Sequence, residues 1–296
     1  MTLESTGVRP YFSTDASLSL SLLSPPLALA RHPSRSIRRP VHTPVAQFEA
    51  RFVMFALLSF APGAVITSAS LARCNAMLDL AYVSSSYDDR LIIGRKAQLG
   101  EEMIYRSGLN IDSTLTYGEF DLNLFASLVD RALDGVADGA TFVDVGSGAG
   151  RLVLAASSLW PRFGLCAGVE CVPELHRVAL DAAARVELPP SSPKCEFVLG
   201  KAEDALGADG RLSSVDVAFA YSSTWPGEGQ YLSDFSLVCG THLKVGARVI
   251  TADRMLMSLE GAWEFRLLDS IEGHNRETGG QSIGYIHEVV QSQRST

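Results

Sequence analysis

The chain has 296 residues, of which 25 are Lys or Arg and 33 are Asp or Glu, so its formal net charge is −8. A hydrophobic fraction of 47% and a charged fraction of 20% are typical of a globular protein and exclude a disordered chain or a fibre. The acidic balance argues against strong nucleic-acid binding, because such binding neutralises phosphates with Lys and Arg. The cysteines form no C-x-x-C pair and no zinc-type spacing, so we expect reduced thiols and no metal site.

The first 72 residues differ in composition from the rest. Residues 1–50 are rich in Ser, Pro, Ala and Arg and poor in acidic residues, which is typical of an organellar transit peptide. Residues 52–72 form a charge-free run of about the length that spans a bilayer, although Pro62-Gly63 interrupts it. The segment Ser59–Pro62 resembles the plastid-import junctions of algae with secondary plastids. We predict a targeting presequence or disordered extension over 1–72 that directs the chain to a plastid. A mitochondrial destination, a simple helix and a retained membrane anchor over 52–72 are alternatives.

From residue 75 to 296 the chain predicts one α/β domain. Apolar runs that end at glycines or polar residues predict buried strands, and stretches with helical spacing lie between them. This alternation implies parallel strands with helices on both faces. Two strand-like segments at the C-terminus have no helix between them, which predicts an antiparallel pair. We expect a doubly wound, mostly parallel sheet of seven strands. The predicted strands are 141–145, 165–170, 195–199, 215–220, 248–252, 263–270 and 282–291, and the predicted helices include 151–159 and 173–186.

A glycine-rich turn links the first predicted strand to the next helix. It contains Asp144, Gly146, Ser147, Gly148 and Gly150. Glycines at this place let the backbone turn sharply and approach a ligand. The spacing differs from the dinucleotide fingerprint G-x-G-x-x-G, and the Gly-Lys-Ser/Thr end of a P-loop is absent, so neither phosphate site is predicted.

The pattern D-x-G-x-G-x-G resembles motif I of class I S-adenosylmethionine-dependent methyltransferases, whose fold is Rossmann-like. The resemblance implies that the glycine turn and Asp144 hold the methionine end of the cofactor S-adenosyl-L-methionine. Glu170 ends the second predicted strand, roughly 20 residues after the glycine turn, and would accept the ribose hydroxyls. After the third predicted strand, Ala202 and Glu203 would contact the adenine, because Lys201 stands where the family usually has Asp.

A second resemblance narrows the family. The sequence T-Y-G-E, which contains Tyr117 and Glu119, is similar to the loop that closes over the cofactor in the non-SET histone-lysine methyltransferases. The fourth strand of those enzymes ends in paired asparagines, whereas here the edge contains Tyr221, Ser222 and Trp225. Hydroxyls and aromatic rings at this edge are suited to position and desolvate an amine, and the rings offer faces for a cation. These three residues are therefore the candidate catalytic residues.

The motifs predict an S-adenosylmethionine-dependent methyltransferase that N-methylates a protein lysine side chain. A small molecule or another macromolecule is the alternative methyl acceptor. A catalytically silent module that binds a partner is a further alternative, which the missing asparagines and Lys201 favour. The glycine spacing disfavours a nicotinamide oxidoreductase. No stable membrane span is expected after processing, and the sequence leaves the oligomeric state open.

Overall fold

The computed structural model describes residues 66–99, 113–207 and 209–294. These residues all belong to one unit of the chain, Phe55–Thr296. The targeting segment that we predict lies outside the described residues up to residue 65, so that part of it stays a prediction. Among the helices that are described, none is long and apolar enough to cross a membrane.

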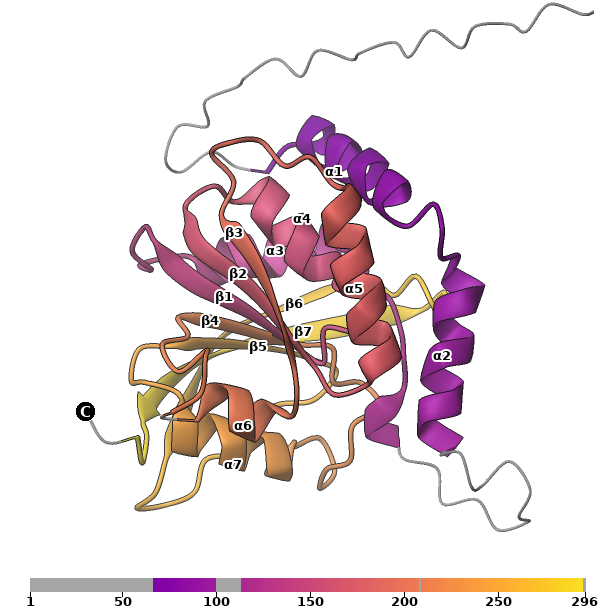
Figure 1. Ribbon diagram of the computed structural model, residues 1–296. Coiled ribbons are helices and arrows are strands. Elements are labelled where there is room, and N and C mark those ends of the chain that lie inside the picture. The colour runs from indigo at the N-terminus through magenta and orange to yellow at the C-terminus, as the bar shows by residue number, and fades with distance from the viewer. Residues whose placement is uncertain (1–65, 100–112, 208, 295–296) are drawn as a thin grey trace, which may run out of the picture. The chain divides into compact units, whose positions relative to one another are not determined.

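A seven-stranded sheet runs through this unit (Figure 1), in the order β3-β2-β1-β4-β5-β7-β6. β7 is antiparallel to both β5 and β6, and the other neighbouring strands pair in parallel. This confirms the predicted doubly wound, mostly parallel sheet with an antiparallel C-terminal pair. The strands are β1 (Ala140–Val145), β2 (Phe163–Glu170), β3 (Lys194–Leu199), β4 (Val217–Ala220), β5 (Arg248–Ala252), β6 (Glu264–His274) and β7 (Gln281–Gln291).

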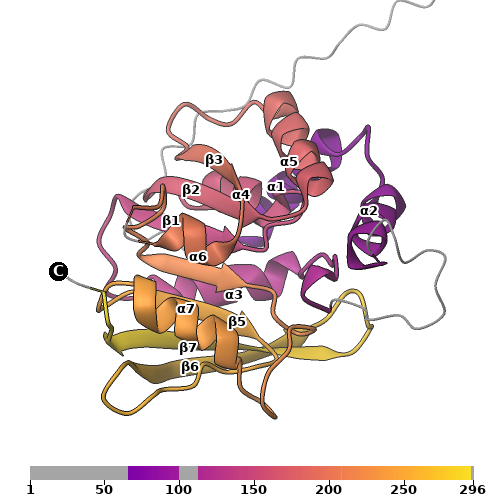
Figure 2. The ribbon, with the colours of Figure 1, turned by 60° about the horizontal axis from the view of Figure 1, so that its bottom comes forward.

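Helices cover both faces of the sheet (Figures 1 and 2). α1, α3, α4 and α5 lie on one face, and α6 and α7 lie on the other. α2 packs against α5 and against the short 3-10 helix η2. The helices are α1 (Ser68–Ala81), α2 (Tyr87–Leu99), η2 (Ser113–Leu115), α3 (Leu122–Ala132), α4 (Arg151–Leu159), α5 (Pro173–Arg185), α6 (Ala202–Leu206) and α7 (Ser233–His242).

Alternate residues of the parallel strands enter two separate apolar cores. On β1, Phe142 packs in the core beneath α3 and α4, whereas Val143 and Val145 belong to the core beneath α6 and α7. Strands that are buried on both faces need near-continuous apolar sequence, which is why these segments were predictable. Because helices cover both faces, the ends of the strands are the accessible part of the sheet for a ligand.

The folded unit begins earlier than the sequence indicates. α1 starts at Ser68, whereas we predict an extension up to residue 72 and a domain from residue 75. Thr67 caps this helix by accepting a hydrogen bond from the Ser70 N–H, and Cys74 and Leu78 are buried against the rest of the domain. The buried side of α1 starts with small residues, so its first turn is hard to distinguish by sequence from the apolar run that precedes it.

Candidate functional site

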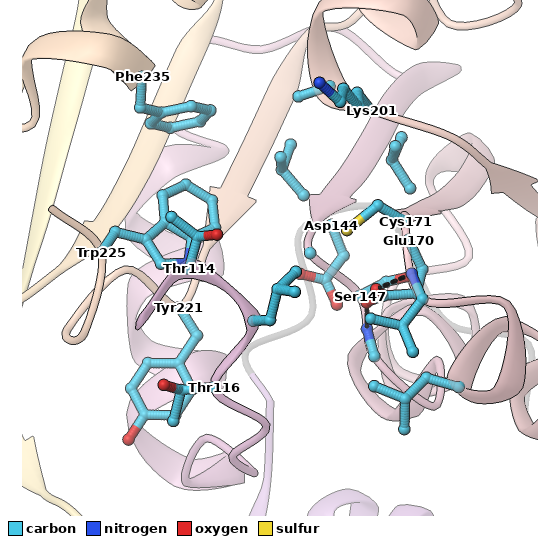
Figure 3. A pocket seen from close by; sticks show the side chains of 18 of the residues that line it. Thr114, Thr116, Asp144, Ser147, Glu170, Cys171, Lys201, Tyr221, Trp225 and Phe235 are labelled. Atoms are coloured by element: carbon cyan, nitrogen blue, oxygen red, sulfur yellow. Dashed lines mark hydrogen bonds between the residues drawn. The ribbon is translucent and has the colours of Figure 1, made fainter. Parts of the chain in front are cut away.

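A cavity of about 1040 Å³ opens at the carboxyl edge of the parallel strands. Figure 3 shows its two walls. Asp144, Ser147 and Glu170 line one wall, and Tyr221 and Trp225 line the other. A cavity of this size is large enough for a small-molecule ligand, for which pockets of roughly 300–1,000 Å³ are usual.

The glycine loop between β1 and α4 requires its glycines. Gly146 and Gly148 have φ angles of +73° and +54°, in the left-handed region where a side chain is strained. A Cβ on Gly148 would lie 2.7 Å from Cε2 of Tyr117, and one on Gly146 would lie 3.3 Å from Cζ2 of Trp225. The two glycines therefore let both aromatic side chains approach the loop closely.

The carboxylate of Asp144 lies at the end of β1, and none of the described residues places a cation beside it. Its residue is 3% exposed, and it makes no hydrogen bond or ion pair with any part of the chain that the structure describes. Burial, and then the charge of Glu170, raise the pKa of Asp144 to about 8. A buried, uncompensated carboxylate is costly, so this position favours a ligand that brings a positive charge.

Glu170, at the end of β2, is held by backbone N–H groups. Gly148 donates to Oε2 at 2.7 Å and Val172 donates to Oε1 at 2.8 Å, as the dashed lines in Figure 3 mark. Burial raises the pKa of Glu170, and these hydrogen bonds oppose the rise. Cys171 adds a backbone and a side-chain hydrogen bond to the same carboxylate, which lines the cavity where the ribose hydroxyls are predicted to bind.

Residues 113–120, which we call the strap, lie over the glycine loop. The hydroxyl of Tyr117 donates to Oε1 of Glu119 at 2.9 Å and accepts from Nε of Arg90 at 3.0 Å. Tyr117 and Glu119 both line the cavity, as the T-Y-G-E resemblance implies. The sequence alone does not reveal the role of Arg90, because α2 shows no clear apolar stripe and its contacts with the strap are mostly polar.

Aromatic contacts fix the wall opposite the acids. The ring of Tyr221 lies 5.0 Å from that of Phe120, edge to face, and its hydroxyl accepts from Nδ2 of Asn275 at 3.2 Å. Trp225 packs edge to face on Phe235 of α7 at 5.2 Å. Two of the three candidate catalytic residues therefore lie at the cavity in fixed orientations.

The other candidates, Ser222 and Gly150, do not line the cavity. Ser222 is fully buried, and its hydroxyl donates to the Ala252 carbonyl at 3.0 Å and accepts from the Ala252 N–H at 3.2 Å. It links the ends of β4 and β5, because neighbouring side chains on an extended backbone point in opposite directions. Gly150 caps α4 with a φ of +80°, and a Cβ there would lie 2.5 Å from the ring of Phe197. The structure thus gives both residues packing roles.

Ala202 and Glu203 line the far end of the cavity, at the start of α6. Lys201 precedes them, with Nζ 3.8 Å from Oε1 of Glu203. The helix α7, which is not among the predicted helices, completes this end with Phe235 and Val238. Within the described ranges, no group of three His, Cys, Asp or Glu side chains could hold a metal ion.

No family model and no curated protein matches the chain. Among solved structures, the YcgJ protein of Bacillus subtilis shares 15% identity over 57% of this chain and 99% of its own, with a TM-score of 0.40. A putative RNA methyltransferase of Pyrococcus horikoshii shares 15% identity over 57% of this chain and 84% of its own, with a TM-score of 0.40. An S-adenosylmethionine-dependent methyltransferase of Thiobacillus denitrificans, in complex with S-adenosyl-L-homocysteine, shares 15% identity over 58% and 92%, with a TM-score of 0.39. Likenesses this weak carry no argument about activity.

The strand order and the position of the glycine loop decide the fold class. The loop follows β1, which lies in the middle of the sheet, and the C-terminal β7 inserts antiparallel between β5 and β6. This strand order, with its antiparallel β7, is that of the class I methyltransferase fold.

Proposed function

We propose that the chain is an S-adenosylmethionine-dependent methyltransferase. The observation that carries this proposal is the buried Asp144 carboxylate, which lies beside a glycine loop and a second acid, Glu170, with no cation next to it in the described ranges. The cofactor would bring an ammonium group to Asp144 and a ribose diol to Glu170. The hydroxyl of Ser147 is also buried, and within the described residues it has no hydrogen-bond partner. The residues present therefore fit the cofactor.

Other parts of the cavity have matching roles in this proposal. Ala202 and Glu203 would contact the adenine, with Phe235 of α7 adding apolar surface. The strap would exclude water through Tyr117 and Glu119. Bound S-adenosylmethionine supplies an electrophilic methyl group, and the chain's contribution is to orient the acceptor and remove water from it.

The methyl acceptor that we propose is the side-chain amine of a protein lysine. The rings of Tyr221 and Trp225 offer faces to an ammonium, and desolvation beside them lowers the pKa of a lysine toward its reactive neutral form. The similarity of the strap to that of histone-lysine methyltransferases supports this choice. A small molecule is the second candidate, since a cavity of about 1040 Å³ has room for such an acceptor beside the cofactor.

Transfer of labelled methyl groups tests the proposal. The full chain should bind S-adenosylhomocysteine in calorimetry and should transfer label from S-adenosylmethionine to proteins of an organelle extract. Mass spectrometry should then find methyl-lysine in the labelled protein. If only small molecules are labelled, the methyl acceptor is a small molecule and not a protein lysine. Binding without transfer to any acceptor would support the silent module, and absence of binding would reject the proposed function.

We also propose an organellar destination, on the composition of residues 1–50. If the presequence is cleaved, the cut should fall before Thr67, because a cut at residue 72 would remove the cap and first turn of α1. Sequencing the N-terminus of the mature protein from its native source checks this expectation. A mature N-terminus within α1 would contradict it.

A further inference from the structure

The helix α2 approaches the strap closely at one point. Gly94 of α2 faces Tyr117, and a Cβ on Gly94 would clash with the Cβ of Tyr117. Gly94 is buried, whereas the next two residues of α2 are exposed. The helix therefore uses a residue without a side chain to reach the backbone of the strap.

Arg90, one turn earlier on α2, connects the strap to the glycine loop. It is 5% exposed, and its Nε donates to the Tyr117 hydroxyl at 3.0 Å and to Oε1 of Glu119 at 2.9 Å. Its guanidinium group lies 4.6 Å from the centre of the Tyr82 ring. The Tyr82 hydroxyl in turn donates to the carbonyl of Ala149, within the glycine loop, at 2.7 Å. The guanidinium group of Arg90 thus contacts two side chains of the strap and a tyrosine that is hydrogen-bonded to the glycine loop.

The contacts of Glu119 fix its position within the strap. Its carboxylate lies 2.5 Å from Nη2 of Arg90 and 3.6 Å from Nε of Arg151. Its backbone N–H donates to Oε1 of Glu277 in the turn between β6 and β7, and the Tyr87 hydroxyl donates to the same oxygen at 2.8 Å. These partners engage Glu119 on several sides, so it is placed to anchor the strap.

We propose that Arg90 is a positioning residue of the cofactor site and that α2 is a clamp on the strap. This inference rests on the proposed function. Arg90 holds Tyr117 against Gly148, and the strap then separates the bound cofactor from solvent. The cofactor leaves past the strap, so loss of the clamp accelerates its dissociation and leaves the methyl-transfer step itself nearly unchanged.

Replacing Arg90 tests the clamp. For Arg90→Met we expect the KM for S-adenosylmethionine and the dissociation rate of S-adenosylhomocysteine to rise about 10-fold or more, because the strap loses its alignment. The kcat at saturating cofactor should change less than about twofold. Arg90→Lys should restore part of the affinity, since an ammonium keeps the charge but not the forked geometry. Arg95→Met is the matched control, because Arg95 is an exposed arginine of the same helix.

Gly94→Ala provides a second test that does not depend on a buried charge. The new methyl group would push on Tyr117 and displace the strap, so we expect weaker cofactor binding. The helix α2 should stay folded, because alanine is a better helix former than glycine. In a Glu119→Gln background, Arg90→Met should add little, since both act on the same strap. Wild-type dissociation rates in both Arg90→Met and Gly94→Ala would overturn the clamp. Failure of the unmodified chain to bind S-adenosylhomocysteine would instead reject the proposed function.

Discussion

Replacing Gly148 with aspartate is expected to lower the affinity for S-adenosylmethionine by about 100-fold or more, with the fold retained. The φ angle of +54° strains any side chain at this position, and the new Cβ would lie 2.7 Å from the ring of Tyr117. The added carboxylate would also lie beside Glu170, which already accepts the Gly148 N–H. The strain costs about 1–3 kcal/mol, which is less than the usual stability of a domain, about 5–15 kcal/mol.

Gly135→Asp is the matched control for this substitution. Gly135 has a φ of +76°, and a Cβ added there would have no atom within 4 Å, so aspartate meets the same backbone strain in open space. Calorimetry with S-adenosylhomocysteine should show normal affinity for the control, and thermal unfolding should show that both variants fold. Normal affinity in the Gly148 variant would place the cofactor elsewhere.

Asp144→Asn is expected to stabilise the protein without cofactor at pH 8. The pKa of Asp144 is raised from 3.8 to about 8, so the unfolded chain releases this proton at a lower pH than the folded chain. The free energy of unfolding therefore falls as the pH rises between these two values, and asparagine removes that loss. We expect the Tm of the variant at pH 8 to exceed that of the wild type by roughly 5 °C, and the two to agree near pH 4. A variant that is less stable than the wild type at pH 8 would contradict the raised pKa.

The same substitution should change how cofactor binding depends on pH. In the proposed complex, the ammonium group of the cofactor binds the ionised form of Asp144. The affinity of the wild type should therefore increase by up to about tenfold for each unit by which the pH is raised toward 8. The asparagine variant should bind more weakly and show no such rise. Calorimetry between roughly pH 5.5 and 7.5 measures both slopes, because the α-amino group of the cofactor stays mostly protonated there. A wild-type affinity that is independent of pH over this range would show that Asp144 does not meet the ammonium.

The sequence was sufficient for those parts of the site that depend on the ends of parallel strands. The ends of β1 and β2 were predicted at Val145 and Glu170, where they are found, because apolar runs stop there at glycines and acids. Neighbouring parallel strands bring such ends together at one edge of the sheet. The positions of Asp144, Glu170 and the glycine loop followed from that rule.

Other parts of the site depend on contacts between residues that are far apart in the chain. Ser222 has the right residue type at the right strand, but its hydroxyl is used by the backbone of Ala252 on β5. Arg90 reaches the strap through polar contacts and through the space left by Gly94, neither of which produces a periodic apolar pattern. Glu277 reaches Glu119 from the β6–β7 turn. Such pairs become visible only when the fold is known.

The contact between Glu277 and Glu119 also bears on the order of events during synthesis. A chain is synthesised from its N-terminus, and a domain generally folds as a unit. Glu277 and β7 are made after the strap, α2 and the glycine loop, and β7 must then insert between β5 and β6. A nascent chain that has not yet reached β7 therefore lacks the hydrogen bond by which Glu277 holds the strap.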